Sequence, residues 1–153
     1  MSTYRVLLVD DEGEELEKAA ALNDGGTVEV VACGSLESAR GAARSGFFHL
    51  ALVDLQLDAT DDKNIEGQIF LRELLDGRPS CRRVLFTRTS SKHREAMFNL
   101  LDPDGAVIDG ALDKSDYERT WQEWVRERAA RWAERAMEID GLDDLQVALS
   151  GDI

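Results

Sequence analysis

The stretch VLLVDDE at residues 6–12 decides the fold of this chain. Its first four residues form an unbroken apolar run, which is typical of a strand buried on both faces of a sheet. The run stops abruptly at three acidic residues. Three later segments repeat this plan of an apolar run that ends in a polar side chain: ALVD at residues 51–54, VLFT at residues 84–87 and ALDK at residues 111–114. The sequence therefore predicts several buried strands, each of which ends at a polar residue.

Helix-forming segments separate these strands. Residues 14–22 are rich in Ala and Glu and are followed by the helix-stopping sequence NDGG at residues 23–26. The strands are predicted at residues 4–9, 27–32, 47–54, 83–87 and 105–112, and the helices at residues 14–22, 35–46, 67–75, 92–101 and 115–139. Such alternation predicts an α/β fold, with a five-stranded parallel sheet covered by helices on both faces. In these folds, sites form beyond the carboxyl ends of the strands.

The residues at the predicted strand ends form a chemically coherent set. Asp10 and Asp11 follow the first strand, Asp54 the third, Thr87 the fourth and Lys114 the fifth. Taken singly, each has an ordinary structural explanation, such as helix capping for the first two. Together, three carboxylates repel one another and need a cation, and a few hard oxygen ligands suit Mg²⁺. An Asp nucleophile beside Mg²⁺, a hydroxyl and an ammonium group indicates phosphoryl transfer to a carboxylate.

Over residues 4–128 the chain resembles the response-regulator receiver family of two-component signalling. The segments at residues 6–12, 51–55, 84–87 and 112–114 carry the resemblance, because they occur together in the family's order and strand context. The resemblance implies a flavodoxin-like fold whose strands are ordered 2-1-3-4-5. It also implies that Mg²⁺ is held by Asp10, Asp11, Asp54 and the main-chain carbonyl of Gln56.

The same resemblance implies a function for the strand-end residues. Asp54 would take a phosphoryl group from a phosphohistidine on a sensor histidine kinase or a phosphotransfer protein. Thr87 and Lys114 would contact the phosphoryl oxygens. We therefore expect a phosphoacceptor that takes part in its own phosphorylation and dephosphorylation, and not an enzyme that turns over an external substrate.

Four features depart from the family pattern. Ser115 occupies a position where the family usually has Pro, often after a cis peptide bond. Ala111 replaces the switch aromatic of the fifth strand, so rotation of an aromatic ring there cannot be the readout. Arg88 stands where a small residue is common, and the acid-rich segment at residues 55–66 is longer than usual. Phosphorylation remains the expectation, but its output is predicted to differ.

Two alternative functions remain open. The first is a receiver-like protein-interaction module that keeps the fold without using phosphorylation, which the departures at Ala111, Ser115 and Arg88 motivate. The second is a phosphatase of the haloacid-dehalogenase type, which also uses an Asp after its first strand, a Thr and a Lys. That family's first motif is Asp-x-Asp, whereas Glu12 occupies the third position here, and its chemistry does not need Asp54.

The last predicted helix is longer than a receiver domain requires. Its apolar stripe comprises Trp121, Val125, Ala129, Trp132, Ala136 and Ile139. We divide the chain into a receiver domain at residues 1–128 and an extension of the last helix with a short tail at residues 129–153. Because the extension should have passed the domain, its stripe is expected to serve homodimerisation or partner docking. The alternative is that the extension bends back or is a solvated, charged linker.

Composition narrows the class of partner and the compartment. The 153 residues include 31 acidic and 18 basic side chains, for a net charge of -13. Such a chain repels nucleic acid backbones and anionic membranes, so we expect neither as a direct partner. Cys33 and Cys81 have neither disulfide-framework nor metal-site spacing, and the start of the chain does not resemble a signal peptide. A cytoplasmic location is expected.

Overall fold

The computed structural model describes residues 3–23, 26–55, 57, 65–87, 100, 107–114, 120–139, 141 and 145. Its elements are β1 (Tyr4–Val9), α1 (Gly13–Leu22), β2 (Val28–Cys33), α2 (Leu36–Ser45), β3 (Leu50–Val53), α3 (Glu66–Gly77), β4 (Arg82–Thr87), β5 (Gly110–Asp113) and α5 (Trp121–Ala136). The helix predicted at residues 92–101 falls, apart from Leu100, outside the described residues.

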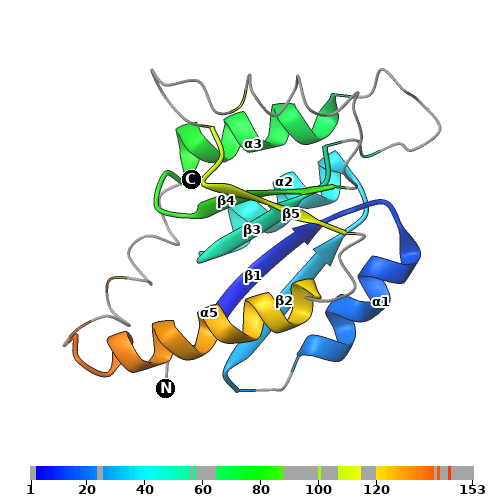
Figure 1. Ribbon diagram of the computed structural model, residues 1–153. Helices are drawn as coiled ribbons and strands as arrows, with labels where there is room; N and C mark the ends of the chain where they lie inside the picture. Colours follow the sequence, from blue (N-terminus) through cyan, green and yellow to red (C-terminus); the bar gives the residue numbers. More distant parts are fainter. Residues whose placement is uncertain are drawn as a thin grey trace.

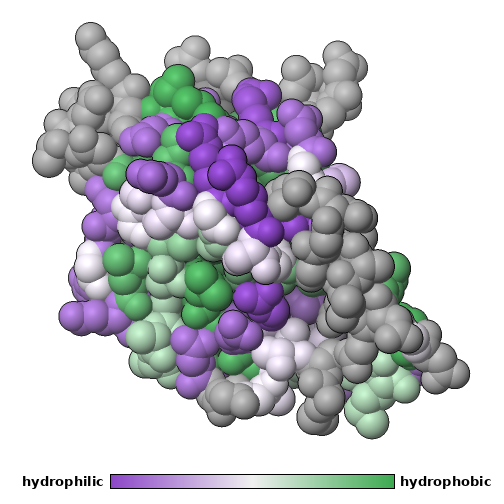
Figure 2. All heavy atoms as spheres, turned by 180° about the vertical axis from the view of Figure 1, so that it is seen from behind, coloured by the Kyte–Doolittle hydropathy of each residue, from purple (hydrophilic) through white to green (hydrophobic). Residues whose placement is uncertain are grey.

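The five strands form one parallel sheet in the order β2-β1-β3-β4-β5, which confirms the predicted flavodoxin-like order. In Figure 1, α1 and α5 lie on one face of the sheet, and α2 and α3 lie on the other. Figure 2 shows the molecule from behind, where hydrophilic side chains alternate with smaller hydrophobic areas. Among the described residues, no helix has both the length and the apolar composition needed to cross a bilayer.

The central strands are buried on both faces because each contributes to two separate cores. Along β1, Leu7 and Val9 belong to the core beneath α2 and α3, whereas Val6 and Leu8 belong to the core beneath α1 and α5. Side chains on a strand alternate between faces, so an unbroken apolar run is what a strand with helices on both sides requires. This burial confirms the interpretation of residues 6–9.

The fifth strand begins later than predicted. The backbone N–H groups of Val107 and Ile108 donate to the carbonyl of Leu100, at 2.8 and 3.4 Å. These donors are therefore unavailable to β4, and regular pairing starts only at Gly110. Both residues are nevertheless buried, so their apolar side chains serve the core without being part of a strand.

The last helix packs on the domain further than predicted, and the expectation that residues beyond 128 leave it was wrong. Ala129 is buried, and the ring of Trp132 lies 4.5 Å from the ring of His49 and 5.7 Å from that of Tyr4, centroid to centroid. The residues at the starts of the strands extend the apolar face of the sheet, so the turn of α5 beyond residue 128 still packs on it. The helix ends at Ala136, and the next apolar residue, Met137, is 84% exposed. The boundary after residue 128 stays a prediction.

His49 is a structural residue whose neutral form the fold requires. The backbone N–H of Arg5 donates to its Nδ1 at 2.9 Å, and the ring of Tyr4 stacks on it at 4.9 Å. Burial lowers the pKa of His49 from 6.5 to about 4, because a charged imidazole would lose hydration there.

We expect this histidine to make the protein acid-labile. Its pKa is lower in the folded state, so the unfolded chain takes up the proton first as the pH falls. The stabilisation is complete above about pH 6.5 and is lost progressively towards about pH 4, at about 1.4 kcal/mol per unit of pKa difference and up to about 3 kcal/mol in all. Urea unfolding at several pH values should show a shallower acid loss for His49→Asn, which cannot titrate. Identical pH slopes for the two proteins would contradict the assignment.

Candidate functional site

Four polar residues lie at the carboxyl edge of the sheet because the strand register aligns them. Val9 of β1 pairs with Val53 of β3, so Asp10 and Asp54 are the next residues on neighbouring strands. The backbone N–H of Asp54 donates to the carbonyl of Val9 at 2.9 Å, and that of Lys114 donates to the carbonyl of Thr87 at 3.1 Å. The backbone pairing thus continues one residue past each strand and fixes where these side chains start.

Lys114 connects the ends of three strands. Its Nζ lies 2.7 Å from Asp10 Oδ2 and 2.8 Å from Asp54 Oδ2, and 3.7 Å from Glu12 Oε1. The lysine side chain is only 2% exposed, and Asp10 is fully buried. An ammonium group so placed offsets the repulsion between two carboxylates that burial has deprived of water.

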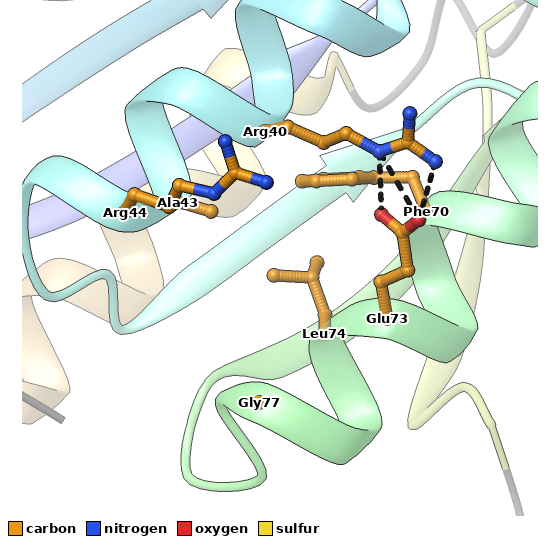
Figure 3. A pocket seen from close by; sticks show the side chains of 7 residues that line it. All are labelled: Arg40, Ala43, Arg44, Phe70, Glu73, Leu74 and Gly77. Carbon is orange, nitrogen blue, oxygen red and sulfur yellow. Dashed lines mark hydrogen bonds and ion pairs between the residues drawn. The ribbon is translucent and has the colours of Figure 1, made fainter. Parts of the chain in front are cut away.

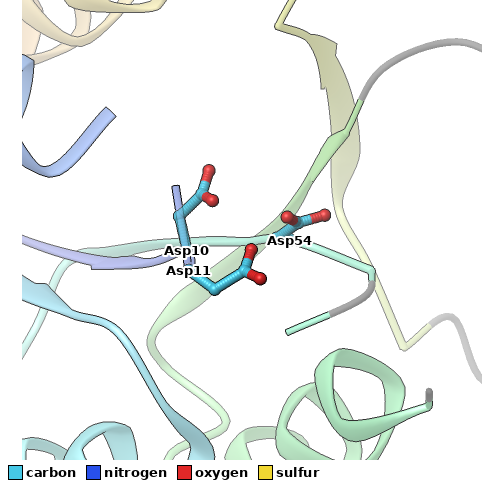
Figure 4. A group of neighbouring side chains, drawn as sticks. All are labelled: Asp10, Asp11 and Asp54. Carbon is cyan, nitrogen blue, oxygen red and sulfur yellow. The ribbon is translucent and has the colours of Figure 1, made fainter. Parts of the chain in front are cut away.

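The three aspartates predicted as metal ligands are brought together. Asp10, Asp11 and Asp54 each offer a carboxylate oxygen, and these oxygens all lie within 4.8 Å of one another. Figure 4 shows the three side chains at the ends of β1 and β3. The group offers hard oxygen donors and excess negative charge, which is the donor chemistry that Mg²⁺ favours. These residues therefore fit a bound Mg²⁺.

Burial controls the electrostatics of the site. It raises the pKa of Asp10 from 3.8 to about 7, although the nearby Lys114 opposes the rise. Burial alone would lower the pKa of Lys114, but the carboxylates of Asp54 and Asp10 outweigh it, and the pKa of this lysine is raised. The ammonium group is therefore charged at neutral pH. A buried site with a fixed, positively charged ammonium group is suited to chemistry on an anionic group.

Of the remaining residues singled out in the sequence for this site, Thr87 lies in the described part of the chain and three others do not. Thr87 is buried at the end of β4, between the strands that carry Asp54 and Lys114. Gln56, the fourth predicted metal ligand, lies outside the described residues, as do Arg88 and Ser115.

Sequence reasoning missed the structural role of Gly67. A Cβ atom on this residue would lie 1.8 Å from the carbonyl oxygen of Asp54 and 2.6 Å from that of Leu55. The start of α3 therefore rests directly on the backbone that carries Asp54. A glycine near the start of a helix was the only available signal, and it does not by itself reveal what the helix touches.

A line of contacts leads from the site to the last helix. Lys114 Nζ lies 5.3 Å from the centre of the Phe86 ring, and that ring meets Trp121 edge-on at 5.8 Å between centroids. The indole N–H of Trp121 donates to Oε2 of the buried Glu15 at 2.8 Å, which ties α5 to α1. Ala111 on β5 is exposed and carries no ring. In the described part of the chain, the aromatic side chain that Lys114 contacts is Phe86.

Comparison with known proteins gives structural matches only. No family model matches the chain, and no curated protein does. A CheY-like response regulator receiver domain protein from Methanospirillum hungatei superposes with a TM-score of 0.68 at 23% identity, over 88% of this chain and 99% of the other. The BeF3-activated receiver domain of DrrB gives 0.64 at 20% identity, over 87% and 99%. The response regulator TrrA from Thermotoga maritima, in complex with Mg²⁺ and BeF, gives 0.57 at 24% identity, over 80% and 96%.

Proposed function

Starting from the receiver-domain fold of this chain, we propose that it is a phosphoacceptor whose phosphorylated residue is Asp54. The observation that carries the proposal is the position of Lys114, whose ammonium group touches both Asp10 and Asp54 while Asp11 completes a set of three carboxylates. Lys114 now neutralises the negative charge of the Asp54 carboxylate. A phosphoryl group on Asp54 would put a larger negative charge in its place. The lysine is therefore already placed to hold a phosphoryl oxygen.

The proposed donor is a phosphohistidine on a sensor histidine kinase or a phosphotransfer protein. A carboxylate oxygen of Asp54 forms a bond to phosphorus as the phosphorus–nitrogen bond breaks, and the histidine leaves with the bonding electrons and takes up a proton. Lys114 and the Thr87 hydroxyl hold phosphoryl oxygens. Asp10, Asp11 and Asp54 would hold Mg²⁺, which when bound would supply positive charge beside the anionic groups. Residues of this chain thus position and stabilise one transfer, without turnover of an external substrate.

The proposed output runs through Phe86 instead of an aromatic residue on β5. When Lys114 moves toward a phosphoryl oxygen, its contact with the Phe86 ring changes, and Phe86 packs on Trp121. Because Trp121 is fixed to Glu15, the change reaches the packing of α5 against α1. The surface of α5 is therefore the proposed switching surface for a dimer or partner.

The proposed location of this function is the cytoplasm. Cys33 and Cys81 are free, buried thiols, and free thiols are typical of proteins in a reducing compartment.

Intact-mass analysis with Mg²⁺ and acetyl phosphate tests the proposal. We expect one added phosphoryl group on the natural chain and none on Asp54→Asn, because the amide is not a nucleophile. Chelation of Mg²⁺ should prevent the adduct, and returning the ion should restore it. Asp113→Asn is the matched control, since it removes an exposed carboxylate from the end of β5, an edge strand of the same sheet.

The outcomes separate the competing functions. An adduct that persists in Asp54→Asn and disappears in Asp10→Asn would favour the phosphatase hypothesis, in which the first strand supplies the nucleophile. Absence of any adduct, with acetyl phosphate and also with phosphorylated histidine kinases, would favour the interaction module. The exposed Ala111 is the observation that keeps this second function under consideration.

A further inference from the structure

A basic and aromatic groove lies at the amino edge of the sheet, opposite the aspartates. Its volume is about 400 Å³. Four arginines line it, Arg82, Arg128, Arg131 and Arg135, together with the aromatic side chains of Tyr4 and Trp132. No part of the phosphoacceptor site contributes to it, so its chemistry needs a separate explanation.

The topology of the sheet brings these residues together. Tyr4 is the first residue of β1 and Arg82 the first of β4, and the starts of parallel strands meet at one edge. In Figure 1 the start of β1 lies beside the second half of α5. The arginines of α5 follow one another at intervals of three and four residues, which places them on one face of the helix.

The charges in this groove are unusual for so acidic a chain. Within the described ranges, Arg82, Arg131 and Arg135 form no ion pair, although the sequence contains 31 acidic residues. The hollow between α2 and α3 is different, because its Arg40 is paired with Glu73 (Figure 3). Guanidinium groups with no carboxylate of their own recognise carboxylates from elsewhere through paired hydrogen bonds.

An aromatic wall accompanies the arginines. The rings of Tyr4, His49 and Trp132 contact one another with centroid separations of 4.5 to 5.7 Å. Trp132 is only half-buried, so part of its ring is available to a ligand. Rigid aromatic rings beside arginines are the side chains that contribute most to binding at protein interfaces.

We propose that this groove binds an acidic peptide segment of a partner protein, with Arg82, Arg131 and Arg135 holding its carboxylates and Trp132 receiving an apolar or aromatic side chain. A peptide fits better than a nucleic acid, because the net charge of -13 repels a long polyanion while the local field still favours a short acidic segment. Binding here is independent of Asp54, which lies at the other edge of the sheet.

The peptide Glu-Glu-Phe-Glu-Glu, capped at both ends, is a suitable probe in a titration of ¹⁵N-labelled protein. We expect chemical-shift changes confined to residues around the groove, including the Trp132 indole N–H. The double substitution Arg131→Glu and Arg135→Glu should weaken binding by at least roughly tenfold, the effect of about 1.4 kcal/mol. Both side chains are exposed, so the fold should be retained. Asp54→Asn should bind the peptide like the natural chain.

Matched controls decide the outcome. Arg126→Glu makes the same charge change at an exposed residue of the same helix that does not line the groove, and should leave binding nearly unchanged. The proposal is overturned if this control weakens binding as much as the double variant. It is also overturned if Gln-Gln-Phe-Gln-Gln binds equally well, or if single-stranded DNA occupies the groove more tightly than the acidic peptide.

Discussion

Lys114→Met should lower the free energy of unfolding by about 3–5 kcal/mol in the absence of divalent cations, because it leaves two buried carboxylates without their shared partner. Asp10 is fully buried and the Asp54 side chain is 10% exposed, so water cannot replace the ammonium group. Methionine keeps much of the length of the lysine and its apolar stem, so the loss reports mainly on the charge. Urea unfolding with a chelator present measures this difference.

Added Mg²⁺ should recover much of that loss. A ligand that binds only the folded state stabilises it in proportion to its affinity, and removal of a competing ammonium group increases the affinity of the carboxylates for a cation. The rise in unfolding free energy with Mg²⁺ should therefore be larger for Lys114→Met than for the natural chain. Equal rises would contradict a metal site that shares Asp10 and Asp54 with the lysine.

Arg40→Met is the appropriate control for this substitution. Its guanidinium group pairs with the carboxylate of Glu73, but here both side chains are well exposed, at 39% and 41%. Ion pairs near solvent contribute at most about 1 kcal/mol. If both variants lost the same small amount, the burial of Lys114 between the aspartates would be wrong.

Gly67→Ala should destabilise the protein by about 1–3 kcal/mol or more, the usual cost of forcing extra volume into a packed site. The added methyl carbon would lie 1.8 Å from the Asp54 carbonyl oxygen, so α3 or the end of β3 has to move. The same movement displaces the Asp54 side chain, and we expect slower phosphorylation as well as a lower unfolding free energy. Chemical unfolding and the rate of adduct formation measure the two effects.

Gly41→Ala supplies a control of opposite sign. Gly41 is exposed within α2, and a Cβ there would meet nothing within 4 Å. Alanine is favoured over glycine inside a helix by up to about 1 kcal/mol, so this variant should be slightly more stable. A stabilising effect at both positions would show that the start of α3 does not rest on the backbone of Asp54.

Patterns local in the chain accounted for the sheet and for the principal site residues. An apolar run that ends in a polar residue specifies both a strand buried on two faces and the side chain at its carboxyl end. Parallel strands then bring Asp10, Asp54 and Lys114 to one edge, as predicted. The strand order was predicted from the family resemblance. The strands have similar apolar sequences, and hydrophobic periodicity does not identify which strands are neighbours in a sheet.

Contacts between distant segments were beyond the sequence. The sequence shows Gly67 and Glu15 but not what they contact. Only the packing shows that Gly67 touches the backbone of Asp54 and that Glu15 is buried against Trp121. Trp132 was expected to have passed the domain, and instead it packs on Tyr4 and His49.

The sequence by itself determined the α/β class, the parallel sheet and the acidic site at its carboxyl edge, because hydrophobic periodicity and the residues at strand ends are local properties. The tertiary structure alone decided which charges are paired. It placed the ammonium group of Lys114 between two buried aspartates, and it gathered Arg82 and Arg131 into a groove at the opposite edge. The physical reason is that electrostatic pairing depends on distance and burial, and both are set by packing between segments far apart in the chain.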